Sequence, residues 1–479
     1  MRYSVLVHLT KMARTLQEAA AYIDTAPDGD SLCPELLSNG VKMLEQIRVT
    51  VEQHRDDLCD SVLLEHLSAA EALWDEGGDA LQGALEAFAQ ALPNCVRYQI
   101  RAVFFIGLGS TWDAMQSVYE YMCDDPRFDP IIVRMPTLRT IMQNGKLNKT
   151  VLYSDFLAPM GIPSLDYHQY HIEADCPEVA FTSQPYENCC SVQFWPENIA
   201  KYSRLIYLPY FLPDLVDNTS VEAMARQSVF RFAWKVICSS EKHYKFYCKY
   251  AANKGANALV SGLPKTDHLV TLCDREILIR HDWSRLDGKT VILWNSWYDI
   301  LASSFQYADQ LLAWFEAHPD YGLIWRPHPL TDMVTKFQRP EQYDAYQEAR
   351  WKVQAAKNMI LDEDSSYEAA FTVSNAMISD YSSMLPQYLL INKPALWIRT
   401  KTFSFTGEKF IDTSWMEQAE NVGEIYRFME NIHAGKDPNC ELRKMIRQRD
   451  LPLADGHCGA RVCESIWNDI HAEDGIAQE

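Results

Sequence analysis

The chain has 479 residues, of which 47% are hydrophobic, and a formal net charge of −21. So acidic a chain is a poor general binder of nucleic acid or of an anionic membrane surface, because both attract proteins through Lys and Arg. Its thirteen cysteines include no Cys-x-x-Cys pair, its N-terminus has no secretory pattern, and it has no run of about 18 apolar residues. We therefore expect a globular cytoplasmic protein with two to four domains.

The first part of the chain, residues 1–97, has a helical pattern. Apolar residues recur every three or four positions in several stretches, as in Leu9-x-x-Met12. The pattern breaks at Pro27 and at Gly77-Gly78. The segment holds seven Lys and Arg against sixteen Asp and Glu, so we expect a small helical bundle with an acidic, solvated face. A partner-binding segment is the alternative.

Residues 98–270 change to alternating strands and helices. Helical patterns separate five buried-strand runs, at 102–106, 131–133, 179–181, 205–208 and 236–238. The Gly-x-Gly that follows the first run indicates a tight turn and is not the dinucleotide-binding fingerprint. The alternation predicts one doubly wound, Rossmann-like domain.

A second alternating series lies within residues 271–454. Its strand runs are at 291–294, 323–325, 359–361, 376–378 and 395–398. Its helical patterns are at 303–317, 341–356, 367–373 and 384–391. We expect a second Rossmann-like domain, and therefore a cleft between the two.

Polar clusters follow the strands of this second domain. In an open parallel sheet, ligands bind outside the carboxyl ends of the strands. The clusters are Asn295-Ser296-Trp297, Arg326-Pro327-His328, Asp362-Glu363-Asp364 and Ser379-Asp380-Tyr381-Ser382-Ser383. We expect them to meet at one edge of the sheet and to form a binding site.

The Ser382-Ser383 pair stands where a strand gives way to a helix. Small hydroxyl side chains can cap that helix and leave its free N–H groups accessible to an anion. An ordinary serine cap would explain the pair alone; together with Arg326 it predicts a diphosphate site. We predict that His328 acts as a general acid or base, or donates a hydrogen bond to a phosphate oxygen. The alternative is a structural histidine between two prolines.

We predict neither a metal site nor a cofactor. Asp362-x-Asp364 is more typical of a turn cap than of a metal site. His457, Cys458 and Cys463 lack the spacing and the number of ligands that zinc requires.

These motifs resemble those of the CDP-glycerol glycerophosphotransferase family, of the teichoic-acid polymerase type. Four blocks match in the family's order: Arg326-Pro327-His328-Pro329, Asp364-Ser365-Ser366-Tyr367, Ser379-Asp380-Tyr381-Ser382-Ser383 and Lys393-Pro394. Looser matches are Leu208-Pro209-Tyr210, the block Gly262–Asp267, and Asp455-Gly456 with Arg461.

The resemblance implies a GT-B fold: two Rossmann-like domains face a cleft, and a terminal helix within 455–479 crosses back. It implies that an acceptor hydroxyl attacks the β-phosphate of CDP-glycerol and that CMP leaves. Positioning and charge stabilisation carry most of such a phosphoryl transfer. The acceptor would be a glycan or a lipid-linked molecule, which would bring the protein into peripheral contact with the inner face of the membrane.

The resemblance also assigns residues to roles. Arg326 and His328 would be catalytic. The residues that would hold the donor phosphates are Ser382, Ser383, Asp380 and Tyr381. The residues expected on the nucleotide side are Asn295, Asp364, Tyr367 and Lys265.

One block of the family is absent. Teichoic-acid polymerases carry Trp-His-Gly in the first domain, whose His is the usual candidate base; the corresponding region here, residues 181–187, reads Phe-Thr-Ser-Gln-Pro-Tyr-Glu. His168, His171 and Glu187 are the acceptor-side candidates, each with a structural role as the alternative. The acceptor therefore stays open between teichoic acid, capsule and another phosphate-linked surface glycan.

Two other functions remain open. A GT-B glycosyltransferase or epimerase that uses a UDP-sugar could hold its diphosphate at the same helix start. A non-catalytic protein would instead bind a partner through residues 1–97.

Overall fold

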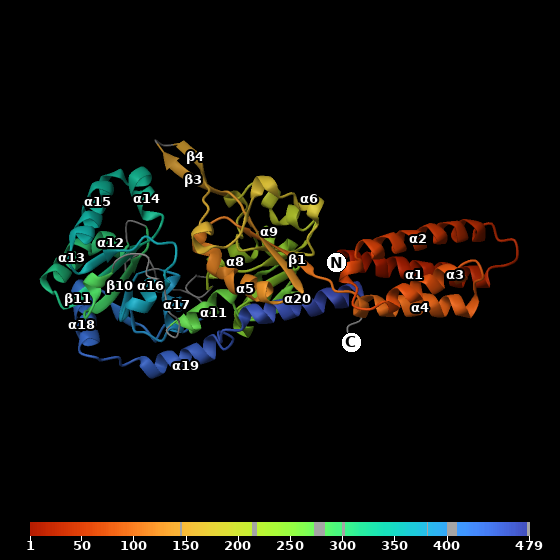
Figure 1. The fold of residues 1–479 in the computed structure, drawn as a ribbon. Helices are drawn as coiled ribbons and strands as arrows, with labels where there is room; N and C mark the ends of the chain where they lie inside the picture. The colour runs from red at the N-terminus through yellow and green to blue at the C-terminus, as the bar shows by residue number, and fades with distance from the viewer. Residues whose placement is uncertain are drawn as a thin grey trace.

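The computed structural model describes residues 1–143, 146–212, 218–272, 283–298, 302–380, 382–399 and 410–476. The chain forms a helical N-terminal unit and then two α/β units, and its last helix returns to the first of these (Figure 1). Each α/β unit contains one parallel sheet with helices packed on it, as the sequence predicts.

Four helices form the N-terminal unit: α1 (Tyr3–Thr25), α2 (Cys33–Gln53), α3 (Val62–Leu73) and α4 (Gly78–Cys95). Leu9, Leu67 and Phe88 are buried in its core, because each lies on the apolar stripe of its helix. Gly40 of α2 makes room for Trp74, since a Cβ atom there would lie 1.8 Å from Cζ2 of the indole ring. The unit projects from the α/β units as an elongated bundle (Figure 1).

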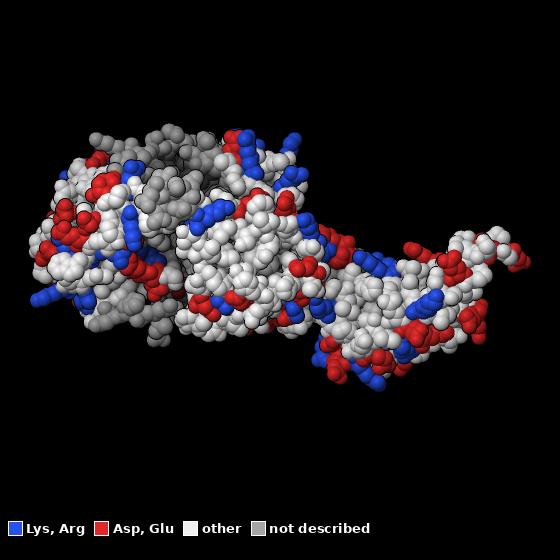
Figure 2. All heavy atoms as spheres, turned by 90° about the horizontal axis from the view of Figure 1, so that it is seen from above, with Lys and Arg blue, Asp and Glu red and all other residues white. Residues whose placement is uncertain are grey.

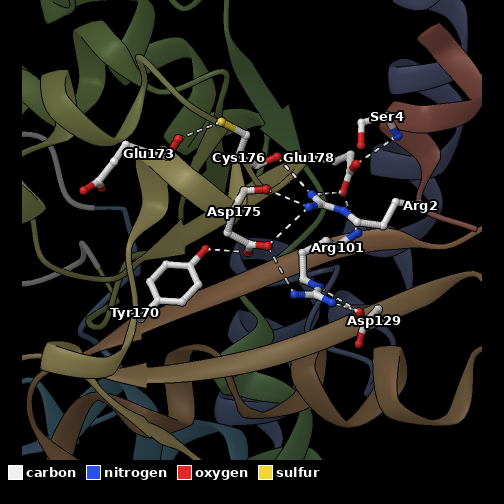
Figure 3. Close-up of polar contacts among 9 residues, drawn as sticks. All are labelled: Arg2, Ser4, Arg101, Asp129, Tyr170, Glu173, Asp175, Cys176 and Glu178. Atoms are coloured by element: carbon white, nitrogen blue, oxygen red, sulfur yellow. Dashed lines mark hydrogen bonds and ion pairs between the residues drawn. The ribbon is translucent and has the colours of Figure 1, made fainter.

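A network of ion pairs joins α1 to the first α/β unit (Figure 3). Arg2, just before α1, donates to the carbonyl oxygen of Asp175 at 2.6 Å and pairs with the carboxylate of Glu178 at 3.2 Å. Glu178 is 6% exposed and also accepts from the backbone N–H groups of Ser4 at 2.9 Å and Arg101 at 2.8 Å. A buried carboxylate with three donors is fully satisfied, so the network fixes the bundle to the amino ends of the strands.

The first α/β unit has a parallel sheet of order β5-β2-β1-β6-β7-β8-β9. Its strands are β1 (Ile100–Ile106), β2 (Phe128–Arg134), β5 (Leu165–Asp166), β6 (Val179–Thr182), β7 (Arg204–Tyr207), β8 (Lys235–Cys238) and β9 (Ala258–Val260). Its helices are α5 (Gln116–Asp124), α6 (Ile172–Asp175), α7 (Pro196–Ile199), α8 (Asn218–Ala225), α9 (Ser228–Phe232), α10 (Glu241–Tyr250) and α11 (Asp267–Val270). All five predicted strand runs are strands. The two edge strands, β5 and β9, are too short to give a sequence signal.

A β-hairpin that the sequence analysis did not predict interrupts this unit. β3 (Thr137–Gln143) and β4 (Lys146–Leu152) pair antiparallel between β2 and β5. The hairpin stands between the two α/β units, and β3 packs against α14 (Thr331–Gln338) of the second (Figure 1). At its base, Thr137 forms an isolated bridge with Cys190, so the hairpin is anchored to the first unit.

The second α/β unit has a parallel sheet of order β12-β11-β10-β13-β14-β15. Its strands are β10 (Thr290–Ser296), β11 (Tyr321–Pro327), β12 (Met359–Leu361), β13 (Ala376–Ser379), β14 (Ala395–Ile398) and β15 (Glu417–Ala419). Its helices are α12 (Ser303–Gln306), α13 (Ala308–Ala317), α14, α15 (Pro340–Ala355), α16 (Glu368–Val373), α17 (Met384–Leu390) and α18 (Val422–His433). The five predicted strands are observed. The helix predicted over 303–317 is divided at Tyr307, and α14 was not predicted.

The C-terminal segment connects the second unit back to the first. After α19 (Cys440–Asp450), helix α20 (Cys458–Asp474) packs against α5. Asp267, at the start of α11, accepts hydrogen bonds from the N–H groups of Cys458 at 2.9 Å and Gly459 at 2.8 Å. Arg461 of α20 donates to the carbonyl oxygen of Ser261 at 2.7 Å. The loop before α11 thus caps and orients the returning helix.

Asp267→Ala is expected to lower the free energy of unfolding by about 1–2 kcal/mol, because two N–H groups at the start of α20 lose their acceptor. Glu441→Ala removes an exposed acid from the first turn of α19 and should change it by less than about 0.5 kcal/mol. Chemical denaturation of the full chain measures both variants. Equal, small effects would contradict the capping role of Asp267.

Among the described residues, no helix combines the length and the apolar character that crossing a bilayer requires. On the face seen from above, acidic and basic side chains are interspersed, including over the helical N-terminal unit (Figure 2).

Candidate active site

The carboxyl ends of β11, β10 and β13 lie side by side at the middle of the second sheet. In register, Asn295 on β10 stands beside Arg326 on β11 and Ser379 on β13. The strand order runs outward from β10 on one side and from β13 on the other, so this is the switch point at which open α/β sheets bind ligands. The cluster after β12 adjoins Arg326. The structure therefore brings the four polar clusters to one edge.

Asp380 and Asn295 hold backbone segments at this switch point. The Asp380 side chain is 1% exposed and accepts from the N–H groups of Trp297, at 2.8 Å, and of Ser303 at the start of α12. Asn295 donates through Nδ2 to the carbonyl oxygen of Arg326 at 2.8 Å. The loop after β10 and the end of β11 are thereby fixed relative to β13.

Three buried polar atoms at the switch point have no hydrogen-bond partner among the described residues. They are Oδ1 of Asn295, Oγ of Ser296 and Oγ of Ser379. Leaving a buried polar atom unpaired costs about 1–3 kcal/mol, so such atoms mark a place where a polar ligand or water supplies the partner.

Arg326 is engaged by the loop that follows β12. It is 9% exposed; Nη1 pairs with Asp362 at 2.7 Å and Nη2 donates to the carbonyl oxygen of Asp364 at 2.7 Å. The loop closes on itself, because the Asp364 carboxylate accepts from the N–H of Ser366 at 3.2 Å. A pocket of about 210 Å³ lies beside this loop, lined by residues that include Arg326, His328 and Asp364. The guanidinium holds the pocket wall in place.

His328 is a neutral hydrogen-bond donor in this geometry. Its Nδ1 accepts the N–H of Leu330 at 3.1 Å, which places the ring proton on Nε2. Burial, followed by the charge of Arg139, lowers the pKa of His328 to about 4. The ring packs against Tyr298, with centroids 4.8 Å apart. At neutral pH the free nitrogen therefore carries a proton and can donate it to an anion.

The turn between β13 and α17 contains the serine pair. Ser382 Oγ accepts the N–H of Met384, the first residue of α17, at 3.1 Å. Ser383 occupies the N-cap position and makes no side-chain cap bond. Tyr381, which the sequence analysis assigned to the donor phosphates, lies outside the described residues.

Residues from both α/β units line a second pocket of about 180 Å³. Asp113, in the loop after β1, accepts the hydroxyl of Tyr367 at 2.8 Å and pairs with Lys265 at 3.2 Å. Lys265 is 3% exposed and also donates to the carbonyl oxygen of Tyr210 at 2.5 Å. Burial, followed by the Asp113 charge, raises the pKa of Tyr367 well above its usual value. Lys265 and Tyr367, both expected on the nucleotide side, thus meet through one carboxylate across the cleft.

The three acceptor-side candidates lie at different places. Glu187 lies in the loop after β6, beside β3, and His168 follows the edge strand β5. Both are therefore at the carboxyl edge of the first sheet. His171 is the N-cap residue of α6, between β5 and β6, and lies 3.8 Å from Glu173.

Two charged residues of the cleft, Asp113 and Arg139, were not predicted from the sequence. Asp113 is seven residues after the last residue of β1, beyond the three to five residues that the strand-end clusters of the second unit cover. Arg139 lies on β3, and the Asn-Gly pair between Gln143 and Lys146 is a hairpin signal that would have placed it.

Comparison with known proteins decides the family. The family model of CDP-Glycerol:Poly(glycerophosphate) glycerophosphotransferase matches residues 217–468, more than half of the chain. The chain belongs to this family. The resemblance inferred from the motifs is thereby confirmed, and the protein is an enzyme of the glycerophosphotransferase type. No curated protein matches the chain in sequence.

Solved structures establish the fold of this glycerophosphotransferase. A protein from Listeria monocytogenes assigned as UDP-N-acetylglucosamine 2-epimerase has a TM-score of 0.55 at 12% identity, covering 78% of this chain and 97% of its own. A variant of the wall teichoic acid polymerase TagF, soaked with CDPG, has a TM-score of 0.52 at 14% identity, covering 78% and 89%. Another TagF variant has a TM-score of 0.52 at 13% identity, covering 86% and 99%. The predicted GT-B fold is confirmed.

One motif of the glycerophosphotransferase resemblance has a structural role. Lys393, before β14, donates through Nζ to the carbonyl oxygens of Phe371, Thr372 and Ser374 at 2.6, 2.8 and 2.7 Å. These carbonyls end α16, so the ammonium group caps that helix. The cap fixes the path of the chain into β13, the strand that leads to the switch point.

Proposed function

We propose that the enzyme transfers glycerol phosphate, or a closely related polyol phosphate, from a CDP-activated donor to a hydroxyl of a cell-surface glycan or teichoic-acid-like acceptor. The reaction class follows from the family. The observation that carries the placement of the donor is the switch point of the second sheet. There the neutral imidazole of His328 adjoins a pocket, and three buried polar atoms have no partner among the described residues.

In this proposal the donor diphosphate lies at the carboxyl edge of the second sheet, and the acceptor comes from the first unit. The acceptor oxygen bonds to the β-phosphorus, the bond from that phosphorus to CMP breaks, and CMP leaves with the electron pair. Glu187 and His168 are the residues proposed to take the hydroxyl proton, because both lie at the carboxyl edge of the first sheet.

The protein's side chains supply position and charge. His328 donates to a phosphate oxygen, and the hydroxyls of Ser382 and Ser383 are proposed to contact the same diphosphate. Arg326 acts through the loop that it holds, because both its Nη atoms are engaged there.

The remaining assignments are part of the same proposal. The reaction needs no cofactor, since the donor is already activated. We place the enzyme in the cytoplasm, at the inner face of the membrane, where a lipid-linked acceptor or a growing capsule or teichoic-acid chain would be available. The thirteen cysteines, an odd number without paired spacing, favour a reducing compartment.

Incubation of the purified protein with a glycan acceptor and CDP-glycerol, CDP-ribitol or a UDP-sugar tests the proposal. We expect CMP release from a CDP-polyol and no turnover of the UDP-sugar, because recognition of the base differs while the phosphate contacts are shared. A thermal-shift panel of CDP, UDP and GDP compounds establishes which nucleotides bind. If the folded protein binds a CDP-polyol but releases no CMP, or epimerises the UDP-sugar, the proposal is wrong.

A further inference from the structure

The β3–β4 hairpin extends from the first α/β unit to the edge of the second, and its strand β3 contains the positively charged Arg139. Its base is fixed, because Thr137 bridges to Cys190 and is 2% exposed. Gly107, after β1, permits this close approach, since a Cβ atom there would lie 2.3 Å from Oγ1 of Thr137. From this base, β3 runs to α14, the helix that begins three residues after His328.

Arg139 lies on this strand, two residues after Thr137. Residues two apart share one face of a strand, so Arg139 is on the same face of the ribbon as the anchored Thr137. Its charge lowers the pKa of His328 in the second unit and acts in the same direction on Tyr210 and Cys189 in the first. Because β3 is anchored to the first unit and packs against α14 of the second, Arg139 lies on a strand between the two units.

No counter-ion for Arg139 is found among the residues that the structure describes. Its Nε is buried without a hydrogen-bond partner, whereas Arg326, in the same cleft, pairs with Asp362 at 2.7 Å. A buried, unpaired donor on a charged group is costly, and the planar guanidinium matches the oxygens of a phosphate group. The cation thus has the chemistry of a phosphate ligand.

We propose that Arg139 binds the phosphoryl group in transfer, opposite the imidazole of His328. This inference rests on the donor reaction proposed above. The β-phosphorus gains a bond to the acceptor oxygen and loses its bond to CMP, while negative charge spreads over its equatorial oxygens. A guanidinium from the acceptor side and an N–H from the donor side then stabilise that charge together. The site is complete only when both units contribute.

Arg139→Gln tests the assignment, with Lys149→Gln as a matched control. Lys149 is on β4 opposite Thr140, so it loses the same charge from the same hairpin but on the other face of the ribbon. We expect Arg139→Gln to lower kcat for CMP release by about 10²- to 10³-fold, a typical loss for one charge-stabilising donor, and Arg139→Lys to recover part of it. Lys149→Gln should stay within about twofold of the unmodified enzyme. An Arg139→Gln enzyme that keeps its kcat, including one that only raises KM for the acceptor, overturns the proposal.

A binding measurement separates this inference from the reaction itself. Calorimetry with inorganic pyrophosphate should show binding at least about tenfold weaker in Arg139→Gln than in the unmodified protein and in Lys149→Gln. If the unmodified protein released no CMP, the proposed function would fail, yet this comparison would still decide whether Arg139 contacts phosphate. Equal pyrophosphate affinity in all three proteins, or no binding by the unmodified protein, overturns the proposal.

Discussion

Replacing His328 with alanine is expected to lower kcat for CMP release by about 10²- to 10³-fold while the protein stays folded, because the variant loses the donor that we propose for the transferred phosphoryl group. The backbone N–H of Leu330 binds Nδ1 at 3.1 Å, so the proton available to a ligand is on Nε2. His328→Gln, whose amide group reaches roughly as far as Nε2, should recover part of the activity. His433→Ala, at an exposed position beside Thr290, is the control and should leave kcat unchanged.

The pH dependence distinguishes a donor from a base. A histidine is neutral above its pKa, and the pKa of His328 is lowered to about 4, so the free enzyme keeps the neutral, Nε2-protonated ring from neutral pH down to about pH 5. The kcat/KM profile should therefore show no decline that depends on His328 between pH 8 and about 5. A decline near pH 4 that disappears in His328→Gln would identify His328 as the base instead, because a base must be neutral, whereas Nε2 can donate its proton in both states of the ring.

The same shift has a consequence for stability, whose sign is fixed by proton linkage. Between about pH 6.5 and 4 the unfolded chain binds a proton at His328 that the folded chain does not, so the free energy of unfolding falls as the pH falls through this window. His243, whose pKa burial lowers to about 4, acts in the same direction.

Asp380→Asn is expected to lower the free energy of unfolding by about 2–5 kcal/mol and to weaken donor binding. The carboxylate accepts two buried N–H groups, from Trp297 and Ser303, and an amide can satisfy only one of them. The loop after β10 would then lose its anchor at the switch point. Chemical denaturation and CDP-glycerol titration measure the two effects.

Asp287→Asn provides the matched control for this variant. Asp287 is exposed in the loop before β10, so the same change there should cost less than about 0.5 kcal/mol. If Asp380→Asn were no more destabilising than this control, Asp380 would not be the anchor of the loop.

Local sequence patterns predicted most strands of the two sheets. Strands β12 and β14 match the expected runs at 359–361 and 395–398, because short apolar runs between turn signals are typical of buried parallel strands. The β3–β4 hairpin was not predicted, because its residues are mostly polar and it interrupts an otherwise regular series of strands and helices. The break at Tyr307 between α12 and α13 also has no local signal, because the apolar spacing continues through it.

The location of the candidate site could be predicted from the sequence, but the contacts between its side chains could not. The strand-end rule located Asn295, Arg326, His328 and Ser379, because the carboxyl ends of parallel strands share an edge. It could not show that Arg326 is engaged by Asp362, since that contact depends on the register of β11 against β12. Nor could it supply the tautomer of His328, which depends on the path of the backbone through Leu330.

The chain passes between the two α/β units twice, once after α11 and once between α19 and α20, and Asp267 fastens the second passage to the first. These two passages are covalent tethers that lie near each other. The easiest movement of one α/β unit relative to the other is therefore a rotation about the line that joins the tethers. Such a rotation would widen the gap most at the points farthest from the tethers. Substrate entry should then begin by breaking contacts away from the tethers, such as those between β3 and α14 (Figure 1), while the tethered side acts as a hinge.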